Sequence, residues 1–277
     1  MTLQDLIGVR RRLRRRARRG ESRQVVLHVG VHKTGTSLVQ ALLKAESDRL
    51  RPYGFSYERA FYRLGKTLVH GSPVPAAERQ SLRQEFRALL DRHSGPVVLG
   101  SSESLFGDPF TGYANIRAVA EDLRAILDGE RVRIVACIRR QDEFVQSLYH
   151  QHVKLGGTLT FDRFVETHDV SAYEWDRLLA EYAGAFGREN LSVCCYDVVF
   201  GTGADVLAGI FPDVGRAGFR TRSRPALVNP ALSRKGIAMA IRCNDLLTPE
   251  EQKTFRRFLE QEFPRPPGEP HGLFSPE

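Results

Sequence analysis

Short apolar runs alternate with amphipathic segments along most of the chain. Four runs rich in valine, isoleucine and leucine predict buried β-strands over residues 25–29, 96–100, 132–138 and 191–196. Helical spacing of apolar residues predicts helices that begin near residue 38 and span about 76–92, 114–128, 142–154, 231–246 and 248–262, with further helical segments up to about 186. Alternating strands and helices indicate βαβ units, and hence a three-layer α/β/α arrangement around a central parallel sheet.

Polar residues follow three of the predicted strands. Gly30 to Ser37 follow the first strand, Ser102 and Glu103 the second, and Arg139 the third. Ligands of parallel sheets bind beyond the carboxyl ends of the strands. We therefore expect these three segments to open onto one crevice.

The segment HVGVHKTGTS, residues 28–37, lies between the first strand and the first helix. Glycines allow successive backbone N–H groups to converge, and the helix N-terminus adds its dipole. Thr36 and Ser37 add hydroxyl donors, and Lys33 adds a mobile positive charge. This combination predicts a site for an anion.

The same loop differs from the ATP-binding loop GxxxxGK[ST]. Gly30 and Gly35 have the required spacing, but Thr36 follows the second glycine and Lys33 precedes it. No strand offers an obvious carboxylate for magnesium. A nucleotide kinase or NTPase is therefore kept only as an alternative function.

The third strand leads into IRRQDEFVQS, residues 138–147. Arg139 offers a planar fork for a phosphate, and Ser147 adds a hydroxyl about two helical turns further on. HVGVHKTGTS resembles the 5′-phosphosulfate-binding loop of sulfotransferases that use 3′-phosphoadenosine-5′-phosphosulfate (PAPS), especially the bacterial members. Arg139 and Ser147 match the spacing of that family's 3′-phosphate-binding arginine and serine.

The resemblance implies a P-loop NTPase-like sulfotransferase fold and transfer of a sulfuryl group from PAPS to a hydroxyl, without a metal. By resemblance, the acceptor is a carbohydrate, a glycolipid or a secondary metabolite. Tyr196 resembles the tyrosine that supports the adenine, although capping of a buried strand explains it nearly as well. The donor-binding residues implied are His32, Lys33, Thr34, Gly35, Thr36, Ser37, Arg139, Ser147 and Tyr196.

Two residues are predicted to act in the transfer itself. Lys33 is placed to stabilise charge on the leaving phosphate. The family uses a histidine or a glutamate at the end of the strand before the arginine–serine segment, and here that residue is Glu103. Glu103 is therefore our candidate base, with capping of the next turn or orientation of Lys33 as alternatives, and with His32 and His70 in reserve.

The net charge of +8 is concentrated at the start of the chain. Eight arginines and Asp5 give residues 1–20 a charge of +7, which leaves +1 for residues 21–277. A nucleic-acid-binding core is therefore not indicated. We expect a basic arm over 1–22 and a single domain over 23–277 with a helical C-terminal part. Two interpretations of the arm stay open: a solvated, frayed extension, or a basic segment whose residues 9–19 contact anionic membranes.

A third function class is a non-catalytic protein that binds polyanions or membrane surfaces through this arm. The sequence has no apolar run long enough to span a membrane, and its four cysteines lack the spacing of zinc ligands. We expect reduced, buried thiols in a cytoplasmic protein, peripheral to the membrane if the arm binds it. The oligomeric state is left open.

Overall fold

The structure is a computed structural model that describes residues 23–266, apart from residues 94, 202, 204 and 224–230. The predicted arm over 1–22 lies outside the described residues. The chain divides into two compact units, Met1–Arg139 with Glu174–Pro225, and Arg140–Tyr173 with Ala226–Glu277. The single domain expected over 23–277 stays a prediction.

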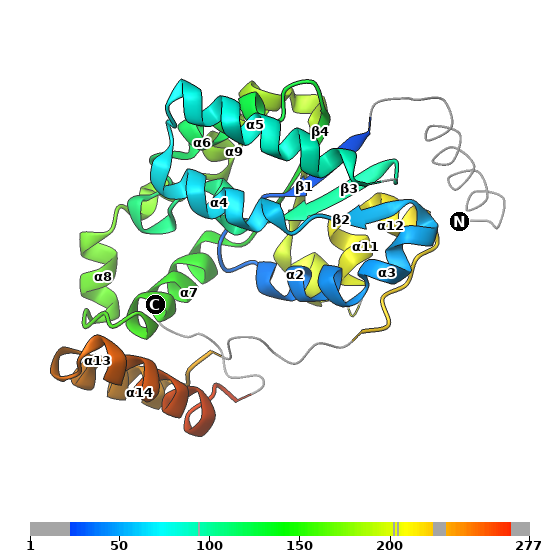
Figure 1. The fold of residues 1–277 in the computed structure, drawn as a ribbon. Coiled ribbons are helices and arrows are strands. Elements are labelled where there is room, and N and C mark those ends of the chain that lie inside the picture. The colour runs from blue at the N-terminus through cyan, green and yellow to red at the C-terminus, as the bar shows by residue number, and fades with distance from the viewer. Residues whose placement is uncertain (1–22, 94, 202, 204, 224–230, 267–277) are drawn as a thin grey trace. The chain divides into compact units, whose positions relative to one another are not determined.

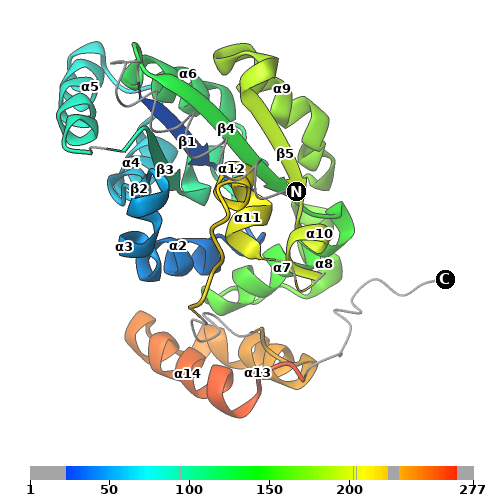
Figure 2. The ribbon, with the colours of Figure 1, turned by 90° about the vertical axis from the view of Figure 1, so that its right-hand side faces the viewer.

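The first unit contains a five-stranded sheet in which every strand pair is parallel. The strand order is β2-β3-β1-β4-β5, and Figure 2 gives a view onto β4 and β5. All four predicted strands are confirmed, whereas β2 was not predicted because its three residues are too few to give a periodic pattern. The strands are β1 (Gln24–His28), β2 (Phe55–Tyr57), β3 (Val97–Ser101), β4 (Arg131–Ile138) and β5 (Leu191–Cys195).

Helices cover both faces of this sheet, which confirms the predicted three-layer α/β/α fold (Figure 1). One face carries α2 (Thr36–Ala45), α3 (Ser47–Leu50), α11 (Val206–Ile210) and α12 (Pro212–Arg216). The other carries α4 (Ala60–Gly71), α5 (Ala76–Asp91), α6 (Ile116–Ile126) and α9 (Trp175–Phe186). A short helix, α10 (Tyr196–Gly201), follows β5 directly, so Tyr196 begins a helix where the sequence predicted the end of a strand.

Helix α2 is fixed to the sheet by its apolar face. Val39 and Leu43 are fully buried and Leu42 nearly so, all within the cluster that also holds β-strand residues such as Val26 and Leu99. Burial of one such side chain contributes about 2 kcal/mol. The N-terminus of α2 is thereby held at the carboxyl end of β1, where the loop over residues 28–37 enters it.

Helix α4 is absent from the predicted elements, because turn signals at Pro52 and Pro73 surround its amphipathic pattern. Its closest approach to the sheet depends on two glycines. A Cβ on Gly65 would overlap Ser102 Oγ, and a Cβ on Gly100 would overlap the ring of Phe61. Helix α4 therefore lies directly against the carboxyl end of β3.

The second unit is helical and consists of α7 (Gln141–Lys154), α8 (Phe161–Thr167), α13 (Arg234–Cys243) and α14 (Pro249–Glu262), with short 3-10 segments. Asn244 Nδ2 donates to the carbonyls of Val153 and Gly157 at 2.9 and 2.8 Å, joining the C-terminal helices to the end of α7. Both predicted C-terminal helices are confirmed.

The cysteines differ from expectation in their exposure. All four are free thiols, and only Cys137 is buried, whereas Cys195 is exposed at the end of β5. An edge strand leaves one of its faces less covered than a central strand, which explains the exposure of Cys195. Within the described part of the chain, no helix combines the length and apolarity needed to cross a bilayer.

Candidate functional site

The carboxyl ends of β3, β1 and β4 lie side by side, as expected from the sequence. The amide of Ser102 donates to His28 O at 3.0 Å, and the amide of Val31 donates to Cys137 O at 3.1 Å. These bonds continue the pairing of the strands beyond their last residues. They bring the start of the 28–37 loop, the Ser102–Glu103 segment and the end of β4 to one edge of the sheet.

The backbone of the loop turns through left-handed conformations at Gly30 (φ 28°), Lys33 (φ 66°) and Gly35 (φ 77°). For Lys33, a residue with a Cβ, this conformation costs about 1–2 kcal/mol. Such strain persists where the surroundings fix it, and here Thr34 Oγ1 donates to Val31 O at 2.5 Å across the turn. Left-handed residues among right-handed ones turn N–H groups toward a common centre, as in anion-binding nests.

The polar atoms at the start of α2 fit an anionic ligand. Thr36 and Ser37 are the first two residues of this helix, so their N–H groups have no intrahelical acceptor. Thr36 Oγ1 is buried without a hydrogen-bond partner among the described residues. A Cβ on Gly30 would stand 2.7 Å from this oxygen, so glycine keeps the space beside it clear. Phosphate or phosphosulfate oxygens are the acceptors that such donors bind.

An aromatic column, formed by Phe200 and Tyr196 of α10, connects this loop to Arg139. A Cβ on Gly35 would stand 2.6 Å from Phe200 Cζ, so the phenyl ring lies against the loop. Phe200 stacks on Tyr196 with 4.7 Å between ring centroids. The guanidinium carbon of Arg139 lies 4.7 Å from the centroid of Tyr196. The column thus sets the position of Arg139 relative to the loop.

Arg139 is also held through its backbone, because Trp175 Nε1 donates to Arg139 O at 2.7 Å. Ser147 belongs to α7 in the second unit, where its side chain is buried. The pairing of Arg139 with Ser147 therefore stays a prediction. The contact of Tyr196 with adenine also stays a prediction, although the ring's packing goes beyond the capping of a strand.

Glu103 opens a 3-10 segment, Glu103–Phe106, directly after β3. Gln40 of α2 donates from Nε2 to Glu103 Oε2 at 3.3 Å and to Ser101 O at 3.2 Å. The segment has no side-chain cap, so the alternative that Glu103 caps the following turn finds no hydrogen bond among the described residues. Gln40, which the sequence analysis missed, ties the carboxylate to the helix that the loop enters.

His32 belongs to the loop and contacts Tyr113. Tyr113 OH lies 3.4 Å from its Nδ1. Burial, followed by the charges of Lys66 and Lys33, lowers the pKa of His32 to about 3. The ring is therefore neutral near pH 7 and is a weak proton acceptor, which disfavours His32 as the reserve base. The other reserve residue, His70, is exposed in the last turn of α4.

His28, at the start of the loop, packs between the end of β3 and Gly30. Its side chain is fully buried, and Nδ1 lies 3.0 Å from Ser101 Oγ at the end of β3. Its Nε2 is buried without a partner among the described residues and lies near Gly30. Burial lowers the pKa of His28 to about 4. The imidazole of His28 is therefore neutral near pH 7 and adds no positive charge to that of Lys33 in the loop.

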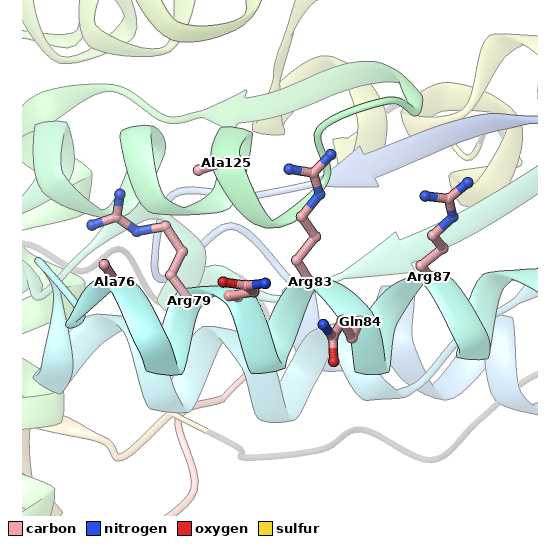
Figure 3. A pocket seen from close by; sticks show the side chains of 7 residues that line it. Ala76, Arg79, Arg83, Gln84, Arg87 and Ala125 are labelled. Carbon is pink, nitrogen blue, oxygen red and sulfur yellow. The ribbon is translucent and has the colours of Figure 1, made fainter.

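A surface hollow with a volume of about 520 Å³ lies elsewhere, on α5 and α6 (Figure 3). Arg79 and Arg83, which point into it, form ion pairs with Asp122 and Asp128 at 2.9 and 2.7 Å. None of its lining residues belongs to the loop or to a strand end, so we do not assign the chemistry to it. They are Ala76, Arg79, Gln80, Arg83, Gln84, Arg87 and Ala125.

Among the described residues, no group of three or more histidine, cysteine, aspartate or glutamate side chains is arranged to hold a metal ion.

The low pKa of His28 predicts a loss of stability in mild acid. An unfolded histidine takes up a proton near pH 6.5 and the folded one near pH 4, so the free energy of unfolding falls as pH decreases through this window. One pKa unit corresponds to about 1.4 kcal/mol, so the loss from His28 reaches about 3 kcal/mol at the lower end. We expect the free energy of unfolding of His28→Gln, measured in urea, to decrease less than that of the wild type as the pH decreases through this window, by about this amount. His70→Gln, at an exposed position, is the control and should decrease like the wild type. An unchanged pH dependence in His28→Gln would contradict the assignment.

Comparison with known proteins finds similarities among the solved structures. One of the matching chains is titled "Crystal Structure of Sulfotransferase from Alicyclobacillus acidocaldarius" and is 16% identical, with a TM-score of 0.47 over 75% of this chain and 87% of that chain. No protein-family model matches, and no curated protein matches either. The similarity concerns only the course of the chain, and it assigns no family, activity or residue role to this protein.

Proposed function

We propose that this chain is a sulfotransferase that binds PAPS and moves its sulfuryl group to an acceptor hydroxyl. The observation that carries the proposal is the linked pair of anion sites. The loop, with the unpaired Thr36 Oγ1, offers one site, and Arg139 offers another beyond the aromatic column. PAPS has anionic groups at both ends of its ribose, the 5′-phosphosulfate and the 3′-phosphate, and it matches such a pair better than a nucleotide with a single phosphate chain.

The donor would then bind with its 5′-phosphosulfate in the loop and its 3′-phosphate on Arg139, assisted by Ser147. Arginine suits this role because its planar fork can make two parallel hydrogen bonds to one phosphate. The remaining loop residues, His32 to Ser37, would surround the phosphosulfate. The 3′-phosphate is the group that distinguishes PAPS from ATP and ADP, so Arg139 would also select the donor.

In the transfer step, the acceptor oxygen forms a bond to sulfur while the bond between sulfur and the 5′-phosphate oxygen breaks. The products are a sulfate ester and adenosine 3′,5′-bisphosphate. Lys33 and the loop amides would stabilise the charge that grows on the leaving phosphate oxygen. Glu103 would take the proton that the acceptor hydroxyl loses, and the hydrogen bond from Gln40 would hold its carboxylate in position.

The alternatives fit the described residues less well. A kinase or NTPase loop needs lysine directly after the second glycine, whereas here Lys33 precedes Gly35. Binding of polyanions or membranes through residues 9–19 concerns the arm and is independent of the loop. We propose a carbohydrate-type acceptor, a glycan or glycosylated metabolite, in line with the sequence resemblance. We also propose a cytoplasmic location, which the four free thiols support.

Substitution of Arg139 tests the donor assignment. We expect calorimetric titration to give much tighter binding of adenosine 3′,5′-bisphosphate than of ADP or ATP. Hydrogen bonds to charged groups contribute about 1.5–3 kcal/mol, so Arg139→Gln should weaken bisphosphate binding roughly 10- to 100-fold and leave ADP binding nearly unchanged. The neighbouring Arg140 is exposed and paired with Asp142 at 2.8 Å, so Arg140→Gln is a matched control and should bind like the wild type. Equal affinities for the three nucleotides in the wild type would refute the assignment.

Substitution of Glu103 tests the base. General base catalysis contributes roughly 100- to 10,000-fold, so Glu103→Gln should lower kcat for sulfuryl transfer by at least about 100-fold. Its affinity for adenosine 3′,5′-bisphosphate should stay within about twofold of the wild type, since we place Glu103 on the acceptor side. Glu121→Gln, an exposed glutamate on α6, serves as control. Transfer at the wild-type rate in Glu103→Gln would assign the base to another residue.

A further inference from the structure

The exposed face of α4 is basic. Arg59, Arg63, Lys66 and His70 follow one another at intervals of three or four residues, which places them on one side of the helix, and all four are exposed. Residues 60–71 contain no aspartate or glutamate. Tyr62 shares this face and is 41% exposed. The result is a positively charged helix face, which we call the α4 face, with one aromatic ring on it.

The charges of the α4 face are not balanced within the described residues. Arg59, Arg63 and Lys66 form no ion pair there, whereas Arg79 and Arg83 on the neighbouring helix α5 each pair with an aspartate. Lys66 Nζ instead lies 5.6 Å from the ring centroid of Tyr62, a cation–π contact that leaves its charge available. A set of exposed cations that form no ion pairs among the described residues attracts anions.

This face adjoins the proposed reaction centre. Gly65 lies against Ser102, and the next residue on each chain segment is Lys66 on α4 and Glu103 after β3. Lys66 is also close enough to act electrostatically on the loop, because its charge helps to lower the pKa of His32. Lys66 is therefore the residue of the α4 face whose charge is felt in the loop that would hold the donor.

We infer that the α4 face binds the acceptor, and that the acceptor carries a negative charge near its reacting hydroxyl, as a carboxylated, sulfated or phosphorylated sugar does. The inference rests on the proposed function and adds the acceptor class to it. Lys66 would contact the anionic group, Arg63 would extend the positive surface, and Tyr62 would offer its ring to the apolar face of a sugar.

Positive charge near the reaction centre would reduce the repulsion between the donor and an anionic acceptor. PAPS is itself an anion, so an anionic acceptor that approaches the sulfuryl group is repelled unless positive charge stands between the two. Lys33 on the loop and Lys66 on α4 are so placed that both act on His32. An ion pair in a partly desolvated site contributes more than one on an open surface, where salt and water weaken it.

Binding of matched sugars tests the inference. The full chain, saturated with adenosine 3′,5′-bisphosphate, is titrated calorimetrically with phenyl β-D-glucoside, phenyl β-D-glucuronide and phenyl 6-O-sulfo-β-D-glucoside, which differ only at C6. We expect the wild type to bind at least one charged sugar roughly five- to tenfold more tightly than the glucoside, which is the effect of about one ion pair. The Lys66→Met variant should bind the charged sugar and the glucoside equally well. Lys44→Met, an exposed lysine on α2, is the matched control and should keep the preference.

The two charged probes distinguish a carboxylate site from a sulfate site. Three results would each overturn the inference. They are equal affinities of the wild type for all three sugars, no binding of either charged sugar, and a preference for a charged sugar that is retained in Lys66→Met. The affinity for adenosine 3′,5′-bisphosphate is measured for every variant. If the wild type binds the nucleotide but shows no preference for charged sugars, only the acceptor class is refuted. If the wild type does not bind adenosine 3′,5′-bisphosphate, the proposed function is refuted as well.

Discussion

The contact between Phe200 and Gly35 is the constraint on which the rest of the site depends. Gly35 adopts a left-handed conformation, and the phenyl ring occupies the space that a Cβ would need. The contact fixes the entry of the loop into α2 and, through Tyr196, the place of Arg139. One glycine therefore determines both the shape of the first anion site and its position relative to the second.

Charge in the site is distributed by burial as much as by residue type. His28 and His32 have lowered pKa values, so both imidazoles of the loop are neutral near pH 7, and Lys33 and Lys66 supply the positive charge near them. The proposed base is held separately, through the hydrogen bond of Gln40. Because Gln40 belongs to α2, whose buried face fixes it to the sheet, the loop and the carboxylate share one rigid support.

The parts of the site that depend on local patterns were predictable from the sequence. Apolar strand runs and the polar residues after them predicted which segments meet at one edge of the sheet. The glycine spacing predicted the anion-binding loop. Contacts between distant segments were not predictable: Gln40 and Glu103 lie 63 residues apart, and nothing in the run around Phe200 indicates its contact with Gly35. Helix α4 was missed because prolines surround it, and with it the basic face beside Glu103.

The most direct test of the account is a crystal structure of the protein with adenosine 3′,5′-bisphosphate. We predict the 5′-phosphate within the loop over residues 28–37, in contact with Lys33 and Thr36, and the 3′-phosphate on the guanidinium of Arg139. A nucleotide bound with its 3′-phosphate away from Arg139, or outside the loop altogether, would contradict it.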